Sequence, residues 1–198
     1  MEKDFSLVAD EILAQCKELY WHVPNNIKKE QIHVRSWNVP KSTAQFLYLM
    51  AFATKAKQIL ELGTSAGYST IWLAKAAQEN GGTVDTIEYF APKCEVAQKH
   101  FKQAGVDEVI TLHQDTILEV LKVWEKDIDF IFMDADRGNY DQYFFYLYPA
   151  LKKGGIIVVD NAGNYRDRMV RFLKAAQEAP HQYSTFLDLD NGLFLFIK

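Results

Sequence analysis

The segment Gln58–Thr70 constrains the fold more than any other stretch of this 198-residue chain. Its first five residues, Gln-Ile-Leu-Glu-Leu, form a short apolar run that predicts a buried strand at 58–62. Gly63 and Gly67 follow, and glycine lets a backbone turn sharply and approach a ligand without a Cβ in the way. A helix predicted at 66–79 then presents its free N-terminal amides to whatever lies over the turn. Together these features predict a cofactor site.

An acidic residue at the end of the next predicted strand sharpens this interpretation. The strand at 83–88 ends in Glu88, and a carboxylate at this place holds ribose hydroxyls in nucleotide-binding folds. The turn lacks the third glycine of the G-x-G-x-x-G dinucleotide motif and carries hydroxyls at Thr64, Ser65 and Tyr68. Such a turn suits an amino-acid end better than a pyrophosphate, which disfavours a nicotinamide-dependent oxidoreductase. The alternative is a strand, turn and helix that bind nothing.

The order of the predicted elements indicates an α/β fold. Strands alternate with helices, which favours a parallel sheet with helices on both faces; the strands lie at 58–62, 83–88, 109–113, 128–134 and 155–160, and the helices at 66–79, 91–104, 115–124 and 139–152. A helix at 166–178 precedes strands at 182–187 and 193–197, and Asn191-Gly192 between them is typical of a tight reversal. We expect one domain over 1–198, with helices at 3–21 and 41–56, joined by a loop, packing on a cofactor-binding α/β core at 57–198.

Charge and hydropathy disfavour several classes of partner. The net charge is −4 with no block of like charge, so we expect no nucleic-acid partner. No secretion signal is visible at the N-terminus, and the apolar runs fall far short of the ~20 residues that span a bilayer, so we expect a cytoplasmic protein with no membrane partner. Cys16 and Cys94 are the two cysteines, and we expect both to be buried and reduced.

Acidic residues lie at or near the ends of the predicted parallel strands. They are Glu61, Glu88, Asp115, Asp134 and Asp160. In open α/β sheets ligands bind beyond the carboxyl ends of the strands, where five carboxylates would repel unless a ligand or cation offset their charge. Asp134, Asp160 and Asn161 supply two carboxylates and an amide oxygen, a donor set that suits Mg²⁺. The alternative is that these residues only cap turns, and Asp115 alone is equally a helix cap.

Four stretches of the sequence resemble one enzyme family. Glu-Leu-Gly-Thr-Ser-Ala-Gly-Tyr-Ser at 61–69 resembles motif I of class I S-adenosylmethionine-dependent methyltransferases, and its Gly-Tyr-Ser end is similar to the catechol and caffeoyl-CoA O-methyltransferases. The stretches 133–140 and 154–161 resemble the two metal-carrying motifs of that cation-dependent family, and 37–45 resembles its pre-helix segment. The resemblance covers about residue 36 to the end. It implies a Rossmann-like methyltransferase fold, with a mostly parallel seven-stranded sheet, a C-terminal antiparallel hairpin and helices on both faces.

The resemblance also implies roles for individual residues. S-adenosylmethionine would lie on nine positions, with Glu88 at the ribose and Asp115 with Thr116 at the adenine; the other six are Val39, Glu61, Gly63, Gly67, Ser69 and Asp134. A divalent cation, Mg²⁺ or similar, would lie on Asp134, Asp160 and Asn161. Arg137 stands where the family has a lysine that is taken as the base, and arginine stays protonated at any ordinary pH.

The catalytic roles therefore fall to Asp134 and Arg137, with Arg137 as a positive charge beside the acceptor oxygen. The alternative for Arg137 is a salt bridge with Asp136 or Asp141. The segment after Asn161 is shorter than the substrate-binding loop usual in the family, which leaves the acceptor open.

We expect an S-adenosylmethionine-dependent O-methyltransferase that acts on a small phenolic or catechol-like hydroxyl with the help of a divalent cation. The alternatives are a cofactor-binding protein with weak or lost catalysis, and a methyltransferase that needs no metal or serves another acceptor. Relatives commonly pair, so the resemblance implies a homodimer. Tyr20 and Trp21 on the N-terminal helix would offer exposed aromatic surface for it, unless that helix packs on its own sheet.

Overall fold

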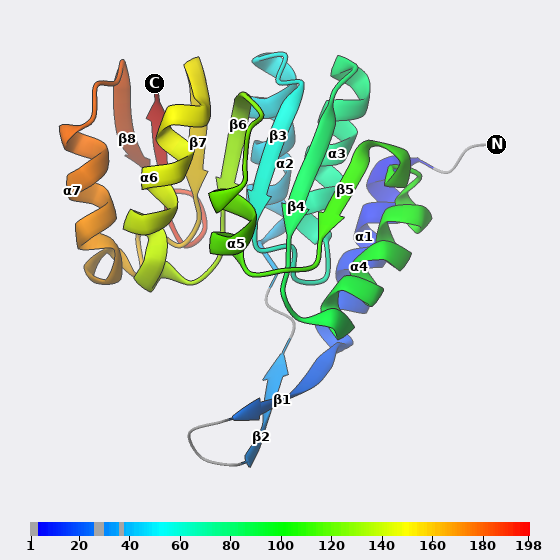
Figure 1. The fold of residues 1–198 in the computed structure, drawn as a ribbon. Coiled ribbons are helices and arrows are strands. Elements are labelled where there is room, and N and C mark those ends of the chain that lie inside the picture. The colour runs from blue at the N-terminus through cyan, green and yellow to red at the C-terminus, as the bar shows by residue number, and fades with distance from the viewer. Residues whose placement is uncertain (1–3, 26–29, 36–37) are drawn as a thin grey trace.

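A seven-stranded sheet forms the centre of the molecule (Figure 1). The structure is a computed structural model that describes residues 4–25, 30–35 and 38–198. The strand order is β5-β4-β3-β6-β7-β9-β8. Five strands run parallel: β3 (Gln58–Leu62), β4 (Thr83–Ile87), β5 (Ile110–His113), β6 (Ile128–Met133) and β7 (Leu151–Val159). The antiparallel hairpin of β8 (Tyr183–Leu187) and β9 (Leu193–Ile197) closes one edge. This arrangement confirms the predicted fold.

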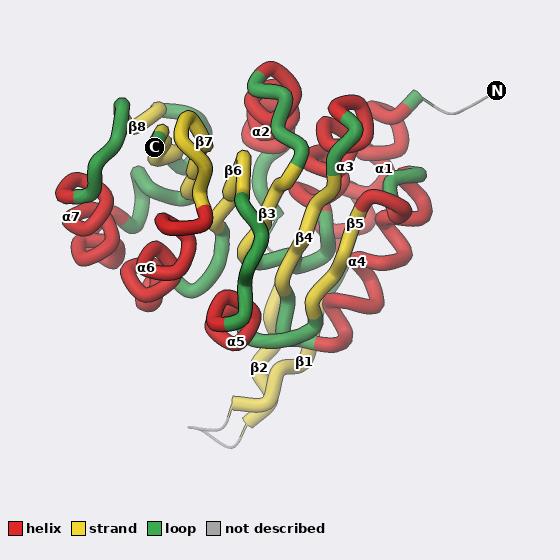
Figure 2. Tube along the Cα trace, turned by 45° about the horizontal axis from the view of Figure 1, so that its top comes forward, coloured by secondary structure: helices red, strands yellow, loops and turns green. Residues whose placement is uncertain are grey.

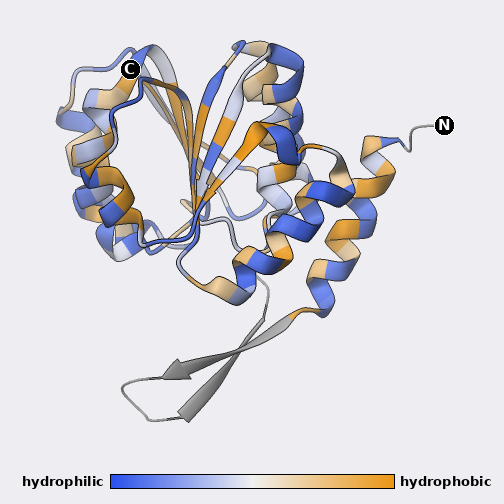
Figure 3. Ribbon diagram, turned by 45° about the vertical axis from the view of Figure 1, so that its right-hand side comes forward, coloured by the Kyte–Doolittle hydropathy of each residue, from blue (hydrophilic) through white to orange (hydrophobic). Residues whose placement is uncertain are grey.

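Helices cover both faces of the sheet (Figure 2). One face carries α1 (Phe5–Glu18), α2 (Lys41–Ala53), α3 (Tyr68–Asn80) and α4 (Ala91–Ala104), and the other carries α5 (Ile117–Lys122), α6 (Tyr140–Ala150) and α7 (Val170–Glu178). Successive side chains of a strand point to opposite faces, so Phe130 and Phe132 of β6 join the first apolar layer while Ile131 and Met133 join the second. Figure 3 shows polar residues on the outer sides of the helices.

The chain after α1 differs from the prediction. The predicted helix 3–21 ends at Glu18, and the predicted loop contains an antiparallel hairpin of β1 (Tyr20–Asn25) and β2 (Glu30–Arg35). Tyr-Trp-His-Val at 20–23 and Ile-His-Val at 32–34 are rich in aromatic and β-branched residues, which favour extended backbone. The side chains of Tyr20 and Trp21 lie outside the described part of the structure, as do residues 36 and 37 of the pre-helix segment.

Other differences concern where elements begin and end. The helix predicted at 66–79 begins at Tyr68, because Gly67 adopts a left-handed conformation as its N-cap (φ 85°). The helix predicted at 166–178 begins with a 3₁₀ turn at Arg166–Met169. Within 4–25, 30–35 and 38–198, the helices are all too short or too polar to cross a bilayer. These shifts leave the carboxyl edge of the parallel strands as predicted.

Candidate cofactor and cation site

The turn after β3 packs tightly against the end of β6 and against α4. A Cβ on Gly63 (φ 96°) would lie 2.3 Å from the carbonyl oxygen of Asp134, and one on Gly67 would lie 2.6 Å from Cε1 of Phe101. A side chain at either position would therefore push the turn away from the end of β6 or from α4. His100 also supports the turn from α4, because its Nδ1 donates to the carbonyl of Ala66 at 2.7 Å. The two glycines are therefore needed for internal packing, and their contact with a cofactor stays a prediction.

Glu61 anchors this turn from below. It is fully buried within β3. The prediction placed it at the end of the strand, facing a ligand. Its carboxylate accepts hydrogen bonds from the hydroxyls of Ser69 (2.6 Å), Thr86 (2.6 Å) and Thr70. Burial raises the pKa of Glu61 to about 7, although these three bonds oppose the shift. The structure thus places Glu61 and Ser69 beneath the turn, and their contact with a cofactor stays a prediction.

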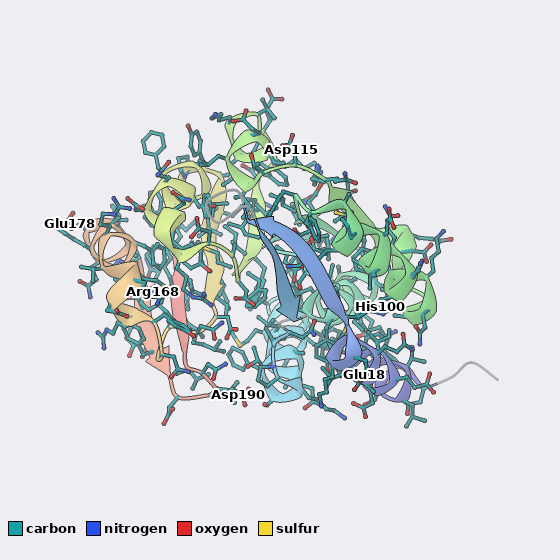
Figure 4. All side chains as sticks on the ribbon, turned by 90° about the horizontal axis from the view of Figure 1, so that it is seen from below. Glu18, His100, Asp115, Arg168, Glu178 and Asp190 are labelled. Atoms are coloured by element: carbon teal, nitrogen blue, oxygen red, sulfur yellow. The ribbon has the colours of Figure 1, made fainter. Side chains whose placement is uncertain are left out.

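Glu88 lies at the end of β4 and borders a cavity of about 690 Å³. Its two carboxylate oxygens accept hydrogen bonds from the backbone N–H groups of Ser65 (3.1 Å) and Phe90 (3.0 Å). The same cavity is lined by Gly63, Asp115, Thr116 and Asp134, so the structure brings together five of the nine predicted cofactor residues. Figure 4 looks onto this edge of the sheet, with Asp115 at one side of it. Sequence reasoning missed the apolar lining residues Ile117, Leu118 and Tyr143.

A second cavity of about 710 Å³ lies beside the first. It is lined by Val39, Asp160 and Asn161, and Val39 is another of the nine predicted cofactor residues. Asp134 and Arg137 line both cavities. The sequence pattern did not predict several other lining residues, among them Lys17, Tyr165 and Asn191. The two cavities therefore meet where Asp134 follows β6.

Asp134, Asp160 and Asn161 lie together as predicted. The side-chain Nδ2 of Asn161 donates to Asp160 at 2.7 Å and to Asp134 at 3.3 Å. Burial and the nearby charge of Asp134 raise the pKa of Asp160 to about 7, and burial also raises the pKa of Asp134. The described residues contain no group of three His, Cys, Asp or Glu side chains that could hold a metal ion. The oxygen donors of this corner are two carboxylates and one amide.

One atom of this corner indicates a missing partner. Oδ1 of Asp160 is buried, and the described residues provide no hydrogen bond to it. A buried carboxylate oxygen without a partner costs free energy, and a cation or a donated proton would remove that cost. The residues present thus fit a hard cation with oxygen ligands.

Arg137 contacts Asp134 and an aromatic ring. Its guanidinium Nη2 lies 3.5 Å from Oδ1 of Asp134, and its guanidinium carbon lies 4.6 Å from the centre of the Tyr165 ring. The predicted alternative, a salt bridge with Asp136 or Asp141, is wrong. The carboxylate of Asp136 caps the following 3₁₀ turn by accepting from Gly138 N at 3.1 Å, and Asp141 pairs with Arg171 at 3.3 Å. Arg137 is thereby held at the junction of the two cavities.

Comparison with known proteins identifies the family. A family model described as O-methyltransferase matches residues 11–182. The chain belongs to this O-methyltransferase family. A catechol O-methyltransferase of Niastella koreensis is 38% identical over 128 residues, which are 63% of this chain and 58% of that protein. The match thus covers little more than half of that relative's length.

Solved structures share the fold. The cofactor-bound protein Rv0187 from MTB has a TM-score of 0.78 at 27% identity, over 99% of this chain and 90% of that one. The O-methyltransferase TomG from Streptomyces achromogenes, solved in complex with SAM, has a TM-score of 0.77 at 23% identity, over 100% of this chain and 90% of its own. At that identity the second likeness concerns the fold alone.

Proposed function

We propose that this protein is an S-adenosylmethionine-dependent O-methyltransferase that acts on a small phenolic or catechol-like hydroxyl with the help of a divalent cation such as Mg²⁺. The observation that carries the proposal is that Asp134 and Arg137 line both cavities. A methyl donor over the glycine turn and an acceptor beside Asp160 would therefore meet at Asp134. Membership of the family supports the reaction, and the name of the Niastella koreensis relative supports the acceptor class.

The first cavity suits the nucleoside end of the donor. Glu88 keeps free lone pairs on both oxygens after accepting from Ser65 and Phe90, so it can also accept from two ribose hydroxyls. Ile117, Leu118 and Tyr143 offer apolar walls for a base, next to the polar groups of Asp115 and Thr116. When bound, S-adenosylmethionine supplies a methyl group made electrophilic by its sulfonium. The protein's part is to hold donor and acceptor in line.

The corner of Asp134, Asp160 and Asn161 suits the cation. Rotation of the Asn161 amide about its last side-chain bond would turn its oxygen toward the two carboxylates, where its nitrogen now donates. When bound, the cation supplies a Lewis acid that lowers the pKa of the acceptor hydroxyl. A pKa of about 7 for Asp160 in the protein alone means that cation binding would release a proton from this carboxyl near neutral pH.

Arg137 adds positive charge beside the acceptor. Only 18% of its side chain is exposed, and Asp134 and Tyr165 fix its position. A guanidinium keeps its protons at ordinary pH, so Arg137 is not the base that takes the hydroxyl proton. The overall reaction converts a phenol and S-adenosylmethionine into a methyl ether, S-adenosylhomocysteine and a proton.

A second candidate is a cofactor-binding protein with weak or lost catalysis. It is favoured by the arginine at 137, where the resembled family has a lysine, and by the short segment after Asn161. The two candidates share the donor cavity and differ in turnover.

The proposal is tested by methyl transfer to catechol with and without a chelator. We expect turnover that requires divalent cation, and we expect Asp160→Ala to abolish it while the affinity for S-adenosylhomocysteine stays nearly intact. Asp127→Ala, at an exposed acid just before β6, is the matched control and should behave as wild type. Turnover that survives exhaustive chelation would show that the corner serves only as turn caps or cofactor contacts.

A further inference from the structure

The turn at 189–192, between β8 and β9, makes hydrogen bonds to two segments beside the second cavity. One is the start of α2, and the other is the segment that follows Asn161. We propose that this turn is a positioning element that sets the separation between the wall before α2 and the wall after β7. The inference rests on the proposed function for what the walls bind: S-adenosylmethionine beside Val39, and a divalent cation beside Asp160. The turn lies far along the chain from the motifs that carry the family resemblance.

Asp190 makes the first connection. Its carboxylate oxygens accept hydrogen bonds from the hydroxyl of Ser42 at 2.6 and 2.8 Å, and one of them also accepts from the hydroxyl of Thr43 at 2.7 Å. Figure 4 shows Asp190 next to α2. Both hydroxyls belong to the first turn of α2, whose N-cap is Pro40 and has no side-chain cap bond. Asp190 therefore supplies the negative charge that a helix N-terminus favours, from a distant part of the chain.

The hydrogen bonds of Asp190 hold the residues next to one wall of the second cavity. Val39, Pro40 and Lys41 line the second cavity and immediately precede Ser42 and Thr43. The backbone of Asp190 has a φ of 53°, in the left-handed region that Asp and Asn adopt more readily than other side chains. The residue type at 190 thus serves both the shape of the turn and the bond to α2.

The backbone of the turn makes the second connection. The carbonyl of Asn191 accepts from the N–H groups of Gly163 (3.1 Å) and Asn164 (3.2 Å), and the carbonyl of Gly192 accepts from Ala162 (2.8 Å). A Cβ on Gly163 would lie 2.8 Å from the Asn191 carbonyl oxygen, so the two backbones are in direct contact. The residues held here directly follow Asp160 and Asn161. Asn191 itself also lines the cavity.

The two connections predict separable effects. Loss of the Asp190 carboxylate frees the start of α2 but leaves the backbone bonds to 162–164. Cofactor affinity should therefore fall more than cation affinity, which loses only the effect of one further negative charge near Asp160. A side chain at Gly163 pushes on the segment after Asn161, so cation affinity should fall more than cofactor affinity. A purely structural turn would change stability without this division.

The test uses calorimetric titration of the full chain with S-adenosylhomocysteine, and separately with Mg²⁺. We expect Asp190→Ala to weaken S-adenosylhomocysteine binding by about tenfold, because the freed start of α2 must then be ordered when the ligand binds. The double variant Ser42→Ala/Thr43→Val removes the donors from the other side and should show the same loss. Combining both changes should add nothing further, because one interaction has been removed twice. Asp190→Asn keeps one acceptor oxygen but loses the charge and should restore part of the affinity.

Two more variants complete the test. Asp188→Ala, at the exposed acid just before the turn, is the matched control and should bind as wild type. Gly163→Ala should weaken Mg²⁺ binding more than S-adenosylhomocysteine binding. A melting curve for each variant separates affinity from stability.

Wild-type S-adenosylhomocysteine affinity in Asp190→Ala, or losses that add in the combined variant, would overturn the inference while the proposed function stands. Equal losses of both ligands in every variant would also overturn it. A wild-type protein that binds neither ligand would overturn the proposed function and the inference together.

Discussion

Glu88 is the residue on which the donor assignment depends most. It is 6% exposed and faces the first cavity from the end of β4. We expect Glu88→Ala to weaken S-adenosylmethionine binding by about 1.5–3 kcal/mol, the cost of losing a charge-assisted hydrogen bond. Glu95→Ala, at an exposed acid on α4, is the control for the loss of one negative charge. Unchanged affinity in Glu88→Ala, measured by calorimetry, would remove the ribose assignment.

Arg137 decides between the two candidate functions. If the cation acidifies the hydroxyl without a side-chain base, Arg137→Lys should change the turnover of catechol little, since both side chains are cationic. We expect this result, with no new ionisation in the pH–rate profile. A rise in kcat of about 10²–10⁴-fold, together with an added ionisation, would show that a positioned base had been lost and would favour the weakly catalytic protein.

The position of a residue relative to its strand end determined which site residues could be predicted. Asp134 and Asp160 each directly follow a strand, and β6 and β7 are neighbours, so their meeting follows from the strand pattern alone. Glu61 lies one residue before the end of β3, where the side chain points to a sheet face and into the core. Tyr165 lies in an irregular turn, and its contact with Arg137 depends on packing that has no local sequence signal.

Among the elements, β3 contains a buried acid, Glu61, that should make the free energy of unfolding depend on pH. The pKa of Glu61 is raised to about 7, so in acid the folded protein holds a proton that the unfolded chain begins to lose near pH 4.5. Stability from this group should therefore be lost as the pH rises from about 4.5 to about 7, by at most about 3 kcal/mol. Asp160 contributes a change of the same sign.

The measurement is chemical denaturation of wild type and Glu61→Gln between pH 4 and 8. The variant should show a smaller fall in the free energy of unfolding across this range, because glutamine does not titrate. The Asp127→Ala variant should keep the wild-type slope. A wild-type free energy that rises from pH 4.5 to 7 in parallel with that of Glu61→Gln would contradict the buried-acid account.

Elements with strong patterns were predicted well. The near-continuous apolar runs of β6 and β7 and the Asn-Gly reversal before β9 fixed the parallel core and the terminal hairpin. The sequence does not predict the hairpin of β1 and β2, because proline and asparagine, as at Pro24 and Asn25, are typical of loops. Strands that pair only with each other leave a weaker pattern than strands buried on both sides.

At the scale of the whole molecule, the site lies where the strand order reverses. From β3 the chain proceeds outward through β4 and β5, then returns to place β6 on the other side of β3. Ligands of open α/β sheets bind at such a switch point. Asp134 sits there, and its backbone N–H donates to Leu62 of β3 at 3.0 Å. The first cavity thus lies toward β4, and the corner of Asp134, Asp160 and Asn161 lies toward β7, on the other side of this point.

Calorimetric titration of the wild-type protein with S-adenosylmethionine, and in parallel with NAD, tests this account most directly. We expect saturable binding of S-adenosylmethionine and none of NAD, because the turn offers an acid at the ribose and lacks the third glycine of a pyrophosphate site. We also expect Mg²⁺ to bind in a separate titration. Binding of NAD in place of S-adenosylmethionine, or of neither, would contradict the account.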